Sequence, residues 1–118
     1  MFEARFTAAV VAGFSSMWVS ASAFAADQPV ASANAISIAR SNACMGCHAV
    51  DRKLVGPSFQ QVAQKYRGDA EAPVKLARKV KNGGAGVWGS IPMPSHPAMN
   101  DDDIRTVVAW VLAGAPQK

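Results

Sequence analysis

The sequence has few of the features with which small proteins usually stabilise themselves. Among its 118 residues only two are cysteines, Cys44 and Cys47, which excludes a framework of several disulfides. No segment shows the alternating apolar and polar residues of a half-buried strand, and no internal repeat is visible. Aromatic residues make up 8% of the chain and are not interleaved with basic ones, so no nucleic-acid partner is expected. The length allows one domain.

Residues 1–25 have the pattern of a cleaved signal peptide. Arg5 precedes an apolar, small-residue stretch that is short for a bilayer span, so we expect export rather than a retained membrane anchor. Ala23-Phe24-Ala25 provides the small residues at which signal peptidase cleaves, and Ala21-Ser22-Ala23 is a second candidate site. No cysteine follows either site, which argues against a lipid anchor. We therefore expect residues 26–118 to form a single periplasmic domain, with no stable membrane insertion.

The residues after the cleavage site predict an all-α fold of about four helices. The clearest helical pattern is the stripe of apolar residues after Asn100, at spacing i, i+3, i+4, i+7 and i+8. Glycine and proline mark the segments 44–57 and 83–97 as loops, and the second is long enough to suggest a functional role. The expected helices are 34–43, 58–66 (capped by Ser58), 71–82 (with Pro73 in its first turn) and a last one that is capped by Asn100 and ended by Gly114.

The sharpest motif is Cys44-Met45-Gly46-Cys47-His48. Two thiols at this spacing can each add to one vinyl group of a single haem, and the next residue then places an imidazole below the iron. The pattern C-x-x-C-H is typical of c-type haem attachment. A domain of this size also depends on a disulfide, a metal or a cofactor for stability, which a covalent haem would satisfy.

Three other interpretations of the two cysteines stay open at this level. They are a Cys44–Cys47 disulfide, a thiol–disulfide oxidoreductase, and a zinc site that also uses His48 and His96. An oxidoreductase would place its reactive thiol at a helix N-terminus after a strand, and no such pattern surrounds these residues. A structural zinc site usually has a second cluster of ligands, which the sequence lacks.

An electron-carrying haem iron needs a sixth ligand, and methionine is the candidate. Met45 lies between the attachment cysteines and cannot reach the other haem face. Met93 is flanked by Pro92 and Pro94, which hold the backbone extended and suit a ligand presented with little reorganisation. Met99 has looser surroundings just before the last helix. An ordinary loop methionine that packs on apolar surface remains the alternative for Met93.

Several motifs in the same order and at similar spacing resemble the small bacterial class I cytochromes c of the c-551 type. The resemblance runs from about Ile36 to Leu112. It is carried by the haem motif and by Val55-Gly56-Pro57, Leu76–Gly83, Gly86-Val87-Trp88-Gly89, Ile91-Pro92-Met93-Pro94 and Trp110-Val111-Leu112.

The resemblance implies a class I cytochrome c fold around one covalently bound haem c. It implies thioethers at Cys44 and Cys47 and axial ligation by His48 and Met93. It further implies a backbone carbonyl of the Pro57 region that accepts the imidazole N–H. Trp88 would donate its indole N–H toward a propionate, and Lys79 would lie near a propionate.

The implied function is one-electron transfer and not catalysis, because two axial ligands leave no vacant position for oxygen or peroxide. Thioether ligation raises the reduction potential. This suits electron transfer from a quinol-oxidising complex, or from other cytochromes, to nitrite reductase, a terminal oxidase or a peroxidase. We expect a monomer that meets these redox partners transiently. The alternative is a haem enzyme or gas sensor with a labile sixth ligand.

Two departures from the family pattern stand out. His96 lies where the family often has an asparagine that hydrogen-bonds the methionine sulfur. His96 could do the same, face solvent, or displace Met93. Ala39 lies where the family usually has an aromatic residue, which puts the local packing in doubt.

Basic residues on one helix face suggest how partners are steered. Lys75, Arg78, Lys79 and Lys81 share this face, with Arg52 and Lys53 near the attachment loop, and the net charge of the chain is +4. A merely solvated helix face is the alternative.

Overall fold

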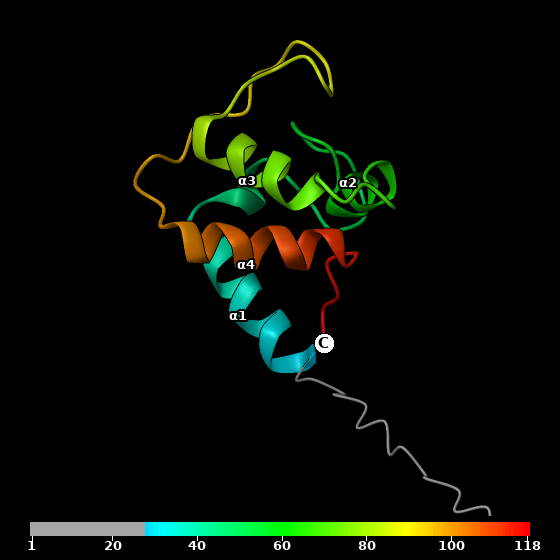
Figure 1. Cartoon of the computed structure of the whole chain (residues 1–118), viewed down its shortest axis with the longest axis vertical. Helices are drawn as coiled ribbons and strands as arrows, with labels where there is room; N and C mark the ends of the chain where they lie inside the picture. Colours follow the sequence, from blue (N-terminus) through cyan, green and yellow to red (C-terminus); the bar gives the residue numbers. More distant parts are fainter. Residues whose placement is uncertain (1–27) are drawn as a thin grey trace, which may run out of the picture.

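The computed structural model describes residues 28–118, in which four α-helices and one short 3-10 helix are present (Figure 1). The elements are α1 (Gln28–Ser41), η1 (Cys44–Gly46), α2 (Phe59–Lys65), α3 (Ala72–Asn82) and α4 (Asp101–Leu112). Over these residues no strand forms, and an isolated bridge joins Gly84 to Met93. The all-α prediction of about four helices is confirmed. The predicted signal peptide, residues 1–25, lies outside the described residues.

Helix α4 forms the centre of the molecule. Helices α1, α2 and α3 each pack against it, and Figure 1 shows α1 and α3 on opposite sides of α4. The predicted stripe is confirmed: Ile104, Val107, Val108 and Val111 are buried, and Leu112 packs partly buried against the same core. Trp110 is also buried, and its indole N–H donates a hydrogen bond to the Pro116 carbonyl oxygen at 2.9 Å.

The predicted bounds of the first helix are wrong at both ends. The helix was expected at 34–43, but α1 begins at Gln28 and ends at Ser41. Ser32, Ala35 and Ala39 are all buried and follow helical spacing, so contact with α4 extends the helix beyond the apolar run seen in the sequence. At the other end Ala43 adopts a left-handed conformation with φ 59°, which turns the chain out of the helix before Cys44. Ala39 is completely buried and therefore belongs to the core.

Helices α2 and α4 begin close to their predicted residues because local side chains cap them. The Ser58 hydroxyl accepts from the Gln61 N–H at 3.0 Å, and the Gln61 side-chain oxygen accepts from the Ser58 N–H at 2.9 Å. Asn100 accepts from the Asp103 N–H at 2.8 Å. Helix α3 starts one residue later than predicted, with Pro73 in its first turn, and α2 ends one residue earlier. From Gln28 onward, no helix is both long enough and apolar enough to cross a membrane.

Candidate functional site

A cavity of about 700 Å³ lies between the attachment segment, α3, the loop after α3 and α4. Its volume falls in the range typical of small-molecule and cofactor sites. Apolar side chains of α3 and α4 form part of its wall, among them Leu76, Val80, Val107 and Val111. All seven site residues predicted from the sequence line it, namely Cys44, Cys47, His48, Pro57, Lys79, Trp88 and Met93.

The two cysteines lie on one short turn. The amides of Cys47 and His48, which follow η1, both donate to the Cys44 carbonyl oxygen, at 3.2 and 3.0 Å. This turn brings the two thiols and the imidazole to one wall. Both thiols are free and half-buried. Burial raises the pKa of the Cys44 thiol, whereas a reactive redox thiol needs a lowered one. This geometry disfavours the oxidoreductase interpretation.

The zinc interpretation also lacks support in the described part of the chain. No group of three or more histidine, cysteine, aspartate or glutamate side chains there could hold a metal ion. His96 is not among the residues that form the cavity wall.

The orientation of His48 is fixed by a hydrogen bond. Its Nδ1 lies 2.7 Å from the carbonyl oxygen of Pro57. Because a carbonyl oxygen only accepts, Nδ1 carries the proton and donates, which leaves the Nε2 lone pair available to a metal. The His48–Pro57 contact is the arrangement that the resemblance implied.

An aromatic chain connects His48 to the hydrophobic core. The imidazole stacks on Phe59 with a centroid distance of 5.3 Å and an interplanar angle of 20°. Phe59 in turn meets Trp110 edge-on at 5.2 Å, and both are buried. Phe59 was not among the site residues predicted from the sequence. Its position directly after the Ser58 cap, close to Gly56-Pro57, is the signal that could have indicated it.

Gly56 allows the backbone to approach the imidazole closely. Its N–H donates to the Cys47 carbonyl oxygen at 2.8 Å, so the chain folds back over the attachment turn. A Cβ at this position would lie 2.5 Å from Cε1 of His48. Any larger residue would therefore push the imidazole or the loop out of place.

Met93 is positioned by its backbone. The Gly84 N–H donates to the Met93 carbonyl oxygen at 3.0 Å, and the Met93 N–H donates to the Gly84 carbonyl oxygen at 2.9 Å. Gly83, with φ 69°, ends α3, and a Cβ there would lie 2.5 Å from the Met93 carbonyl oxygen. Met99 also lines the cavity but is buried in the core, while Met45 packs against the core outside the cavity wall.

The mouth of the cavity is both apolar and basic. Leu54, Val55, Val87 and Ile91 line it and are between 41% and 68% exposed. Lys53 and Lys79 also contribute to the wall. The Lys65 ammonium lies 5.4 Å from the ring centre of Trp88, which places a cation over the indole.

His96 caps the end of α3 with its backbone. Its N–H lies 3.1 Å from the Val80 carbonyl oxygen and 3.2 Å from that of Lys81. Its Nδ1 is buried and has no hydrogen-bond partner. That burial argues against a side chain that simply faces solvent, and its place outside the cavity wall argues against displacement of Met93.

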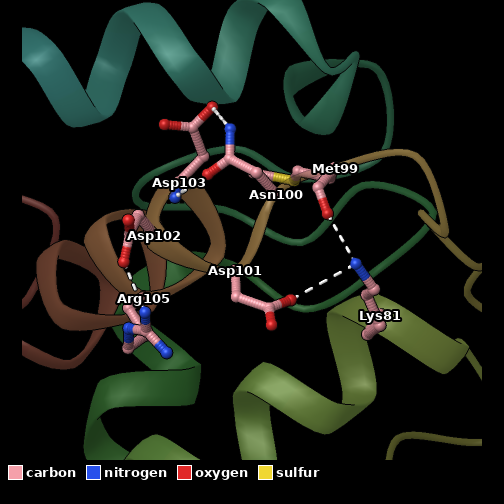
Figure 2. A network of polar contacts seen from close by, with 7 residues as sticks. All are labelled: Lys81, Met99, Asn100, Asp101, Asp102, Asp103 and Arg105. Carbon is pink, nitrogen blue, oxygen red and sulfur yellow. Dashed lines mark hydrogen bonds and ion pairs between the residues drawn. The ribbon is translucent and has the colours of Figure 1, made fainter.

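The predicted basic face is not uniform, because two of its lysines have partners within the chain. Lys75 pairs with Asp69 at 2.8 Å, and this hydrogen bond lowers the pKa of Asp69 and raises the pKa of Lys75. Lys81 bonds the Met99 carbonyl oxygen at 2.7 Å and pairs with Asp101 at 3.3 Å (Figure 2). Arg78 is exposed, and Lys79 lines the cavity.

Comparisons with known proteins agree on one family. The family model described as Cytochrome c matches residues 32–115. Cytochrome c-551 of Pseudomonas aeruginosa is 47% identical over 74 residues, which are 63% of this chain and 70% of that protein. The crystal structure of Nitrosomonas europaea cytochrome c552 superposes with a TM-score of 0.65 at 39% identity, covering 67% of this chain and 98% of that one. The class 1 cytochrome MtoD of Sideroxydans lithotrophicus gives a TM-score of 0.63 at 34% identity, covering 71% and 96%.

Proposed function

The chain belongs to the cytochrome c family, as a small class I cytochrome of the c-551 type, and from this premise we propose that it carries electrons in the periplasm with His48 and Met93 as axial ligands. Membership implies one covalently bound haem c and a role in electron transport. The observation that carries the proposal is the convergence of two thiols, an oriented imidazole and a methionine on one apolar cavity.

Each of these residues has a separate task in the proposal. Bound haem c supplies the one-electron redox chemistry. Cys44 and Cys47 hold it through thioether bonds, and His48 presents Nε2 because Pro57 engages Nδ1. Met93 supplies the sulfur from the loop after α3. Trp88 and Lys79 are the proposed donors to the propionates, supported by their place in the cavity wall.

The cavity walls favour a positive reduction potential. A neutral, soft thioether at Met93 stabilises ferrous over ferric iron. The apolar side chains of α3 and α4 disfavour the extra positive charge of the ferric state, which acts in the same direction. A midpoint well below zero in a potentiometric titration would contradict this part of the proposal.

The proposed partners are redox proteins that bind transiently to a monomer. A quinol-oxidising complex or another cytochrome would be the donor, and nitrite reductase, a terminal oxidase or a peroxidase the acceptor. The net charge of +4, the cavity-lining lysines Lys53 and Lys79, and Lys65 over Trp88 favour partners with acidic faces. Electron-transfer rates should therefore fall as ionic strength rises.

The ligand assignment is tested by absorption spectra of the mature holoprotein and two variants. Wild type should show sharp ferrous bands of a c-type haem, a weak far-red ferric band from sulfur ligation, and no binding of carbon monoxide. Met93→Ala should lose the far-red band and bind carbon monoxide. Met99→Leu, the matched control, should retain the band. A far-red band that survives in Met93→Ala would refute the assignment.

A further inference from the structure

Lys81 connects the two ends of the segment that carries Met93. It lies in the last turn of α3, and its side chain is 37% exposed. The ammonium donates to the Met99 carbonyl oxygen at 2.7 Å and pairs with Asp101 at 3.3 Å (Figure 2). One side chain therefore joins the last turn of α3 to the residues that lead into α4.

Met99 makes this contact relevant to the haem cavity. Its carbonyl oxygen accepts from Lys81, while its side chain is buried and forms part of the cavity wall. The next residue, Asn100, caps α4. A shift of Met99 would therefore move both the cavity wall and the C-terminal end of the Met93 loop, which leads into α4.

The loop between these ends has few other restraints. Gly83, Gly84, Gly86 and Gly89 all have positive φ, and the residues from 84 to 92 are exposed. A pair of backbone hydrogen bonds between Gly84 and Met93 closes the loop on itself, and the His96 N–H attaches it to the carbonyl oxygens of Val80 and Lys81 in α3. A glycine-rich segment of this kind can open locally while the helices stay folded.

The electrostatics of the helix ends favour a cation at position 81. The C-terminus of α3 carries partial negative charge and the N-terminus of α4 partial positive charge. Lys81 and Asp101 each complement the end on which they lie, and they pair with each other across the gap. A neutral residue at 81 would lose both interactions and leave the Met99 carbonyl without its charged donor.

We propose that Lys81 is a positioning residue for the sixth ligand: by holding Met99 against α3 it keeps the Met93 loop closed over the cavity. The proposal rests on the proposed ligation by Met93. A charge-assisted hydrogen bond of this kind contributes roughly as much stability as a five- to thirtyfold change in an equilibrium.

The test compares Lys81→Met with Lys75→Met in the ferric holoprotein. Lys75 is the matched control, since it lies on the same helix and pairs with an aspartate but does not touch the loop. The measured quantities are the rate at which added imidazole displaces the sixth ligand and the hydrogen exchange of the Gly84 and Met93 amides. Lys81→Met should raise both by roughly five- to thirtyfold, and Lys75→Met should leave both unchanged.

Asp101→Asn keeps Lys81 and its bond to Met99 but weakens the ion pair, so a smaller rise in both rates is expected. Equal rates in wild type, Lys81→Met and Asp101→Asn would overturn the proposal, as would an equal rise in Lys75→Met. Amide exchange also separates this proposal from the ligand assignment. If Met93→Ala keeps the far-red band, the ligation fails, while faster exchange in Lys81→Met still reports a loop held by Lys81.

Discussion

The two cavity walls that carry the proposed axial ligands, His48 and Met93, are built in different ways. On the His48 wall a side-chain hydrogen bond, a stacked ring and a close glycine fix the imidazole, and Pro57 and Phe59 are buried. The Met93 wall is an exposed loop held mainly by backbone hydrogen bonds at its two ends. The proposed ligand His48 is fixed by the core and the proposed ligand Met93 is held by a loop, so we expect ligand exchange to begin at Met93.

Removing the Phe59 ring disrupts the His48 wall and should cause the largest loss of stability. Phe59→Ala deletes the ring between His48 and Trp110 and should lower the free energy of unfolding by about 3–5 kcal/mol. Urea denaturation of the ferric holoprotein measures this. Phe59→Leu keeps most of the side-chain volume, so its free energy of unfolding should fall much less. If Phe59→Ala destabilises the protein no more than a substitution of an exposed residue does, the ring does not have this central role.

Gly56→Ala tests the close approach to the imidazole. The new Cβ would meet Cε1 of His48 at 2.5 Å, so either the loop or the ring must move, at a cost of about 1–3 kcal/mol. The rhombicity of the ferric electron paramagnetic resonance spectrum should change as well. Gly46→Ala is the control, because nothing lies within 4 Å of its Cβ. Equal stabilities and equal paramagnetic resonance spectra of the two variants would argue against the steric explanation.

Gly83→Ala makes the corresponding change on the Met93 wall. Alanine would have to adopt φ 69° with ψ −162°, a backbone region that essentially only glycine populates, at a cost of about 1–3 kcal/mol. Its Cβ would also meet the Met93 carbonyl oxygen at 2.5 Å. We expect weaker sulfur ligation, seen as loss of the far-red band at a lower urea concentration than global unfolding. Gly86→Ala has a similar backbone strain, φ 106°, but no close neighbour, and should keep the band. Coincident loss of the band and the fold in Gly83→Ala would contradict the comparison of the two walls.

Lys65→Met removes a contact between α2 and the Met93 loop. The ammonium lies 5.4 Å from the Trp88 ring centre, and an exposed cation–π contact contributes about 0.5–1 kcal/mol. Displacement of the sixth ligand by imidazole should become two- to fivefold faster, an order-of-magnitude range from that energy. Lys65→Arg preserves a cation over the ring and should behave as wild type. If imidazole displaces the sixth ligand at equal rates in wild type and both variants, the contact does not help to hold the Met93 loop.

The Lys75–Asp69 pair should have the smallest effect, and that effect should disappear at extreme pH. The pKa of Asp69 is lowered from 3.8, so its contribution is present above that value and is lost as pH falls through the lower folded-state pKa. The pKa of Lys75 is raised from 10.5, so its contribution is lost as pH rises through the higher folded-state value. The melting temperature of Asp69→Asn should lie slightly below that of wild type near pH 7, and this difference should disappear as pH falls, because the wild type loses the contribution in acid. A large difference between the two melting temperatures at pH 7 would contradict the small contribution expected of this pair.

The parts of the fold that depend on local sequence were predictable, and those that depend on packing were not. Ser58, Pro73 and Asn100 set the starts of their helices within a few residues, so capping rules placed them. The start of α1 depends on burial of Ser32 and Ala35 against α4, which no local signal encodes.

The candidate site likewise has residues that the local sequence indicated and residues that only tertiary packing reveals. The spacing of Cys44, Cys47 and His48 and the prolines beside Met93 pointed to the four central residues. Phe59 and Lys81 act through contacts with residues distant in sequence, at Trp110 and Met99, and therefore appear only in the folded structure.

We propose that His48 and Met93 hold the haem iron from two differently built walls. The most direct test is the proton NMR spectrum of the ferrous holoprotein with labelled methionine methyl groups. The Met93 methyl, assigned by its absence in Met93→Leu, should show the largest upfield shift, because a ligated methyl lies directly over the haem ring. An ordinary shift for Met93, or a larger one for Met99, would contradict the account.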